Sequence, residues 1–188
     1  MTNLSRELTG KRLELLKEAV PKLSRVAILY ESNTPGAERE IKEDLPVAAR
    51  ALRLISKTWE IRVKEDFETG LSAISKDRPD GMLVTSSPLL SSNRQKIVGF
   101  ALTSRIAAMY HRAEYMEAGG LMYYGADVVD GYRQIAWYID KILKGAKPAE
   151  LPVQQPMKFE FVINLQTAKK IGLTINTDIL ARATRIIK

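Results

Sequence analysis

Short apolar runs alternate with segments of helical periodicity through the first two thirds of the chain. Three of these runs are bounded by polar residues and are apolar on both faces, which is typical of buried parallel strands: Arg25–Tyr30, Gly81–Thr85 and Ile106–Tyr110. Around them, the spacing predicts an edge strand at Ile55–Val63 and helices at Ser5–Val20 (capped by Ser5 or Thr9), from Gly36 to about Leu54 with a break at Pro46, Phe67–Ser75 and Asn93–Ser104.

The alternation of strands and helices changes after the third apolar run. There, Gly119-Gly120 predicts a tight turn. A long amphipathic helix is predicted at Asp127–Leu143, because apolar residues recur along one seam, and Gly145 is placed to end it. The other elements predicted here are strands at Leu121–Tyr124 and Phe159–Ile163, a proline-containing extended segment at Ala146–Pro156, and two short helices at the C-terminus.

Strands that alternate with helices predict an α/β fold, a parallel-sheet three-layer sandwich covered by helices on both faces. Right-handed crossovers place the carboxyl ends of the parallel strands along one rim, where open α/β sheets bind their ligands. The residues expected at this rim are Tyr30 to Asn33, Ser86 to Pro88 and Tyr110 to Glu114.

Composition narrows the possible functions. The 188 residues contain no cysteine, which excludes thiolate metal sites and cysteine nucleophiles. The net charge of +7 comes from Lys and Arg scattered beside Glu, without a nucleic-acid-binding signature, so no nucleic-acid partner is expected. The sequence also lacks a glycine-rich phosphate loop, and neither a cofactor nor a metal is expected. Residues 1–7 have no apolar core or cleavage site typical of a secretory signal.

Two candidate binding features lie at the expected rim. Arg112 and Glu114 could hold the two charged groups of a zwitterion, or they could form an exposed ion pair worth at most about 1 kcal/mol. Three tyrosines end predicted strands and offer flat apolar faces with a polar tip, although core packing explains them equally well: Tyr30, Tyr110 and Tyr124. His111, the single histidine, lacks a convincing catalytic partner and is expected to be a rim or surface residue.

Several stretches resemble one family, the ABC-transporter substrate-binding proteins of the tryptophan/tyrosine (TrpX-like) group. The similar blocks are Leu8–Glu18, Arg25–Tyr30, Glu117–Gly125, Asp140–Val153 and Phe159–Leu173. The resemblance covers nearly the whole chain in register. It implies a type I periplasmic-binding fold, in which two α/β lobes joined by three crossings close on a ligand, and it implies a binding protein rather than an enzyme.

The resemblance also implies a division of the chain. Residues 5–124 and 153–188 would form the C-terminal lobe, and residues 125–152 a crossover helix and hinge segment that belongs to the other lobe. Because relatives carry a complete first lobe ahead of the block at Leu8, most of the N-terminal lobe is expected to be missing. The uncovered seam of the helix Asp127–Leu143 then predicts a homodimer or a swapped assembly.

The function implied is that of the solute-binding component of an ABC importer, periplasmic, with a permease partner and an amino acid as the ligand class. The ligand-binding residues expected are Tyr30, Asn33, Ser86, Ser87, Tyr110, Arg112, Glu114 and Tyr124. Three alternatives stay open: the effector domain of a LacI-type regulator, a small α/β enzyme, and a response-regulator-like domain, for which Glu31 stands alone at the end of the first strand.

Overall fold

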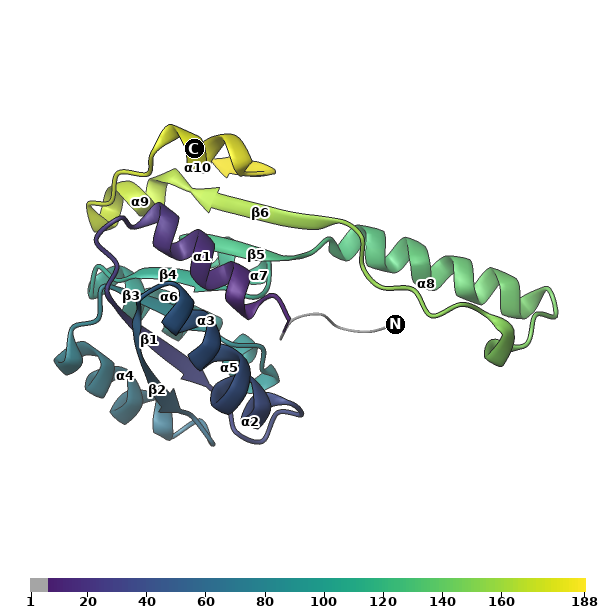
Figure 1. The fold of residues 1–188 in the computed structure, drawn as a ribbon, viewed down its shortest axis with the longest axis horizontal. Helices are drawn as coiled ribbons and strands as arrows, with labels where there is room; N and C mark the ends of the chain where they lie inside the picture. The colour runs from purple at the N-terminus through teal and green to yellow at the C-terminus, as the bar shows by residue number, and fades with distance from the viewer. Residues whose placement is uncertain (1–6) are drawn as a thin grey trace.

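A seven-stranded sheet organises the part of the chain that the computed structural model describes, residues 7–188 (Figure 1). The strand order is β2-β1-β3-β4-β5-β6-β7, and all neighbours are parallel except β5 and β6. The strands are β1 (Arg25–Tyr30), β2 (Ile55–Glu60), β3 (Gly81–Val84), β4 (Ala107–Tyr110), β5 (Met122–Ala126), β6 (Phe159–Asn164) and β7 (Arg185–Ile187).

Helices cover both faces of the sheet, because the central strands are apolar on both sides. In β1, Val26 and Ile28 belong to one buried cluster, whereas Ala27 and Leu29 belong to the other. This alternation follows from the two-residue period of a strand. The first cluster is covered by α1 (Thr9–Ala19), α3 (Leu45–Ala51), α9 (Leu165–Ile171) and α10 (Thr177–Arg182), and the second by α4 (Asp66–Asp77), α5 (Pro88–Ser92), α6 (Arg94–Thr103) and α7 (Glu114–Glu117). The predicted α/β three-layer architecture is confirmed.

The helical region before β2 is interrupted as Pro46 predicted. The short helix α2 (Ala37–Arg39) leads into a π-helical turn, η1 (Glu40–Asp44), and α3 restarts at Leu45, with Pro46 in its first turn. A proline is tolerated there because the first N–H groups of a helix have no intrahelical partner. The π-turn directs Glu40 into the interior, where the hydroxyl of Thr9 donates a hydrogen bond to its carboxylate.

That contact corrects the predicted start of the first helix. Thr9 was expected as a possible cap, but α1 begins at Thr9 after Leu8 without a side-chain cap, and the Thr9 hydroxyl is used in the contact with Glu40. The alternative cap, Ser5, lies outside the described residues.

A protruding arm leaves the sheet after β5 (Figure 1). It consists of α8 (Val128–Leu143), the short turn η2 (Pro148–Glu150) and a returning extended segment that re-enters the sheet as β6. Asp127 caps α8 by accepting a hydrogen bond from the N–H of Asp130. Gly145 ends the helical segment with a φ of 95°, as its position predicted. No residue of α8 is buried.

Candidate functional site

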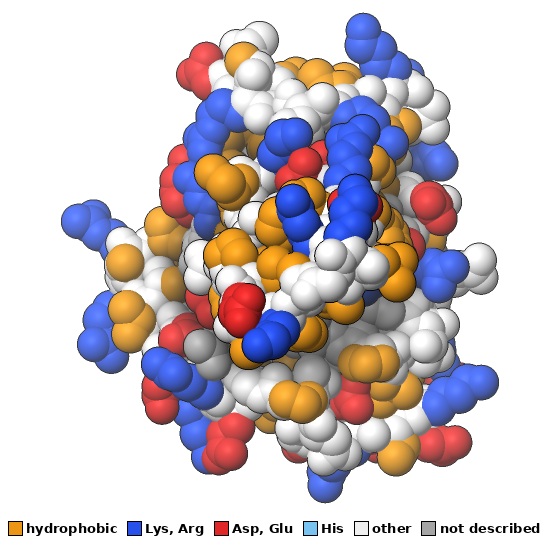
Figure 2. All heavy atoms as spheres, turned by 90° about the vertical axis from the view of Figure 1, so that its right-hand side faces the viewer, with side chains coloured by type: hydrophobic (Ala, Val, Ile, Leu, Met, Phe, Trp, Pro, Cys, Tyr) orange, Lys and Arg blue, Asp and Glu red, His pale blue; other side chains and the backbone are white. Residues whose placement is uncertain are grey.

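The carboxyl ends of β1, β3, β4 and β5 meet along one rim, since these strands are mutually parallel. The loops that leave these ends carry the expected binding residues, and the arm departs from the same rim after β5. The rim is the side of the molecule that faces the viewer in Figure 2. This is where ligands of open α/β sheets bind, so the geometry selects the rim as the candidate binding site.

In one part of the rim, the polar side chains form hydrogen bonds with one another. Ser87 caps α5, because its Oγ accepts a hydrogen bond of 3.0 Å from the N–H of Leu90. The same hydroxyl donates to the carboxylate of Glu31 in the loop after β1, and the Thr34 hydroxyl donates to that carboxylate at 3.2 Å. Ser87 is buried, so its hydroxyl holds the β1 and β3 loops together.

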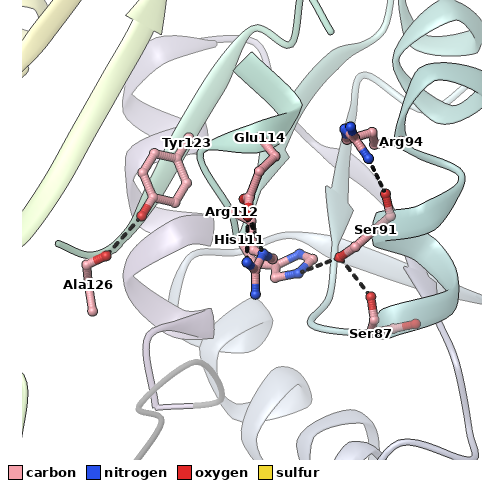
Figure 3. A network of polar contacts seen from close by, with 8 residues as sticks. All are labelled: Ser87, Ser91, Arg94, His111, Arg112, Glu114, Tyr123 and Ala126. Carbon is pink, nitrogen blue, oxygen red and sulfur yellow. Dashed lines mark hydrogen bonds and ion pairs between the residues drawn. The ribbon is translucent and has the colours of Figure 1, made fainter. Parts of the chain in front are cut away.

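His111 directly follows β4, and its ring points toward Ser91 of α5 (Figure 3). The residue is 6% exposed, its Nε2 lies 3.4 Å from the Oγ of Ser91, and its ring meets Tyr115 edge-on with centroids 5.5 Å apart. Burial, helped by the charges of Arg12 and Arg112, lowers the pKa of His111 to about 3. The histidine is therefore neutral at physiological pH and lies at the rim but under its surface.

Arg112 and Glu114 form an ion pair at the surface of the rim. The Nε of Arg112 donates to both carboxylate oxygens of Glu114, at 3.1 Å each. Their side chains are 52% and 40% exposed. The hydrogen bonds from Arg112 hold the pKa of Glu114 below its usual range, and the bond to Glu114 raises the pKa of Arg112. Both groups are thus charged at neutral pH and accessible to a ligand.

A small open hollow lies beside this pair, with a volume of about 170 Å³. It is formed between α5, the first turn of α6 and the loop from β4 into α7. Its lining residues are Ser91, Ser92, Arg94, Arg112, Glu114 and Tyr115.

The remaining expected binding residues are spread along the rim. Tyr30 is partly buried, and burial raises the pKa of its hydroxyl. Asn33 is exposed and Ser86 is partly exposed. Tyr124 is partly buried and stacks on Phe159 of β6, with centroids 6.0 Å apart.

Tyr110 is the expected site residue that the structure places in the core. It is 1% exposed and stacks on Tyr115, with ring centroids 4.6 Å apart. Gly120 makes this packing possible, because a Cβ there would lie 2.8 Å from the carbonyl of Tyr115 and 2.9 Å from the Tyr110 ring. Tyr110 thus supports the hollow from below and does not line it.

Four residues of the hollow are not predicted from the sequence: Ser91, Ser92, Arg94 and Tyr115. They belong to α5, α6 and α7, and neither α5 nor α7 was predicted. A signal for α5 was present, since a serine followed by proline is a common start of a helix: Ser87 is the cap and Pro88 the first helical residue.

Arg12 also escaped. It lies on α1 and is 2% exposed, and its Nε donates a hydrogen bond of 2.8 Å to the carbonyl of Tyr124. A single arginine within the polar positions of an amphipathic helix gives no sign of such burial.

Within residues 7–188, no group of three or more acidic or histidine side chains is arranged to hold a metal ion. In the same part of the chain, no helix combines the length and the apolar character needed to cross a bilayer.

Comparison with known structures supports the fold. A Streptococcus pneumonia ABC domain in complex with L-Trp superposes with a TM-score of 0.84 at 23% identity, over 98% of this chain and 62% of that one. A conserved domain protein from Vibrio cholerae gives a TM-score of 0.84 at 24% identity, over 94% and 59%. The ligand-free, open form of a Clostridium difficile substrate binding protein with adhesive properties gives 0.71 at 19% identity, over 96% and 59%.

The chain therefore spans about three fifths of the length of these structures. No curated protein sequence matches it. The family model described as ABC transporter substrate binding protein matches residues 2–187, almost the whole chain. The chain belongs to the ABC transporter substrate binding protein family.

Proposed function

We propose that this chain forms one wall of the ligand cleft of an ABC importer's solute-binding protein and that it binds a small molecule without transforming it. The observation that carries the proposal is the accessible Arg112–Glu114 pair, placed beside a hollow where the carboxyl ends of the parallel strands meet. Family membership provides the context of transport.

An amino acid is the ligand class that this chemistry favours. A zwitterion presents a carboxylate and an ammonium group, which match the guanidinium and the carboxylate of the pair. The Arg112–Glu114 bonds seen here would partly open to admit such a ligand, at small cost, because the pair is half-exposed to water. A structural neighbour that binds L-Trp supports the choice of class.

The role in import implies two further features. The partner would be an ABC permease, and the protein would be located in the periplasm, outside the cytoplasmic membrane. Ligand capture there would need a second wall, facing the rim described above. We place residues 125–152 with that second wall, because α8 extends away from the sheet and contributes no buried residue (Figure 1).

The returning segment of the arm also lies with α8. The Tyr138 hydroxyl donates to the carbonyl of Pro152 and accepts from the N–H of Gln154, at 3.1 Å in the second case. The sheet is entered again only at Phe159. We therefore draw the boundary of the sheet lobe closer to Phe159 than to residue 153.

We also propose that the chain forms a homodimer through α8. Its outward seam is apolar, and the exposed members are Val128, Tyr132, Ile135, Ile139 and Ile142. Figure 2 shows hydrophobic side chains among Lys and Arg where the arm points at the viewer. An apolar stripe of this kind is normally covered in an interface.

The ligand proposal is tested by screening the twenty amino acids for an increase in the melting temperature of the chain, followed by calorimetric titration of the hits. At a ligand concentration of about 100 Kd, binding adds about 2.7 kcal/mol to stability. Arg112→Ala and Glu114→Ala should each weaken binding of the hit. Arg50→Ala, which removes an exposed arginine from α3, is the control and should not. Turnover of a compound by the chain would contradict the proposal.

The dimer proposal is tested by size-exclusion chromatography with light scattering. The wild-type chain should elute at twice its 21.1 kDa mass, and Ile139→Asp should shift it to the monomer. Thr174→Asp, at an exposed loop position, adds the same charge away from α8 and should remain dimeric. A wild-type chain that stays monomeric at high concentration would contradict this assembly.

A further inference from the structure

The hollow beside the Arg112–Glu114 pair has an unusual floor. Tyr115 lines it and is 0% exposed, and its buried hydroxyl makes no hydrogen bond of good geometry among the described residues. The side chain of Ser91, which also lines the hollow, lies close enough to this hydroxyl to oppose the rise in its pKa that burial causes. Buried hydroxyls are normally paired, because leaving one unpaired costs free energy. An unsatisfied hydroxyl at the base of an open hollow can donate a hydrogen bond to a bound molecule.

The charges around the hollow are unbalanced. Two arginines, Arg94 and Arg112, line it together with one carboxylate, Glu114, which leaves one net positive charge. Glu114 is paired with Arg112. Arg94 has no acidic partner in the described part of the chain, and one of its N–H groups donates a long hydrogen bond of 3.3 Å to the carbonyl of Ser91. The remaining donors of its guanidinium are available to an anion.

The size of the hollow limits what it can hold. Its volume of about 170 Å³ is below the roughly 300–1,000 Å³ of pockets that enclose a whole drug-sized ligand. It fits one polar group of a ligand, and the rest of that ligand would lie outside, along the rim.

We propose that this hollow is a carboxylate subsite, in which Arg94 supplies the charge and the Tyr115 hydroxyl donates a hydrogen bond. This inference rests on the proposed function and deepens it: the ligand is an acid that enters carboxylate first. The single net positive charge matches a monoanion, whereas a phosphate group carries about −1.5 to −2 at neutral pH. Arg112 and Glu114 are then left to the neighbouring polar group of the ligand.

Tyr115→Phe gives the sharpest test, because it removes only the hydroxyl and keeps the ring that stacks on Tyr110. Since the hydroxyl makes no well-formed hydrogen bond within the described residues, the unfolding midpoint of the free chain should stay the same or rise. Binding of the amino acid hit should nevertheless weaken about tenfold or more, the usual effect of removing a hydrogen bond to a charged group. Arg94→Ala should weaken it at least as much, and Arg50→Ala should not.

The probes are the amino acid hit, its decarboxylated amine, acetate and inorganic phosphate, each titrated into the full chain. Tight binding of the amino acid, loss of binding by the amine, and sensitivity to both Arg94→Ala and Tyr115→Phe support the subsite. An amino acid that binds equally to all variants overturns the subsite and leaves the proposed function intact.

Two further outcomes separate the proposals. If acetate binds in an Arg94-dependent way and no amino acid does, the subsite stands and the proposed ligand class fails. If phosphate binds more tightly than any carboxylate, or if no anion binds, the subsite is overturned.

Discussion

The side chain of Arg12 joins α1 to the end of β5: its Nε donates a hydrogen bond of 2.8 Å to the backbone carbonyl of Tyr124, two residues before β5 ends. The arginine is almost fully buried, and burial lowers its pKa to about 10 despite the nearby charge of Glu40. It is still protonated at neutral pH. The buried guanidinium thus connects α1 to β5 close to the point where the arm leaves the sheet.

Replacing Arg12 by Met should destabilise the chain by about 3–5 kcal/mol, because it removes the hydrogen bond to the carbonyl of Tyr124 and the favourable interaction of the guanidinium with the buried carboxylate of Glu40. Urea unfolding followed by circular dichroism measures this loss. The double variant Arg12→Met/Glu40→Met should recover part of it, since both charges are removed together. A single variant with the wild-type midpoint would show that the pair contributes nothing.

Stability should fall with acidification through His111. Its pKa is about 3 in the folded chain, whereas that of an unfolded histidine is about 6.5. Between these pH values His111 is protonated in the unfolded chain but not in the folded chain. The free energy of unfolding therefore decreases as the pH falls, by at most about 1.4 kcal/mol per pH unit.

Urea unfolding at pH 7, 6 and 5 tests this dependence, and His111→Gln should flatten it over that range. Carboxylates whose pKa is lowered in the fold, such as Asp66, Asp77 and Glu114, contribute their pH dependence below this window. The same slope in both proteins would mean that His111 is not the group responsible.

Gly120→Ala should destabilise the chain by about 1–3 kcal/mol, the usual cost of overpacking. The new Cβ would lie 2.8 Å from the carbonyl oxygen of Tyr115, a backbone atom that cannot swing aside. Gly99→Ala is the matched control, because it lies within α6 and its Cβ would meet nothing within 4 Å. That change should raise stability by about 0.5–1 kcal/mol, in thermal or urea unfolding. Equal effects at the two glycines would contradict the packing described.

The central parallel strands β1, β3 and β4 could be predicted from the sequence because their burial is nearly continuous. Val26 to Leu29 are all buried, and a run of this kind needs helices on both sides. The helix α8 could be predicted from its periodicity although none of its residues is buried. By contrast, β7 has only three residues and is partly exposed, so it leaves no apolar pattern.

The candidate site was harder to predict for a physical reason. Which strand-ending tyrosine faces the rim depends on the loop that follows, and the sequence pattern does not fix that loop. Tyr110 packs on Tyr115 because α7 folds back immediately after β4. Arg94 reaches the hollow because α5 inserts one extra helical turn before α6, which the pattern did not reveal.

The backbone amides of α8 should exchange with deuterium much faster than those of β3. An isolated helix of 16 residues with no buried side chain is only marginally stable in water, whereas β3 is buried throughout. Hydrogen exchange read by mass spectrometry measures the contrast in dilute solution. If the chain dimerises through α8, protection there should increase with protein concentration. Protection equal to that of β3 at the lowest concentration would contradict the exposure of this helix.

The arm is attached at one end only, so a small change of angle at its base moves its tip by a large distance. The N–H of Asp127 bonds to the carbonyl of Lys158 at 2.9 Å, and beyond that bond the outgoing and returning chains are no longer paired within the sheet. The 16 residues of α8 extend about 24 Å from this point. A tilt of the helix axis by about 10° at Asp127 would move the tip of α8 by about 4 Å at that length. A change of angle too small to disturb the strands therefore displaces the tip of α8 by more than the diameter of a water molecule.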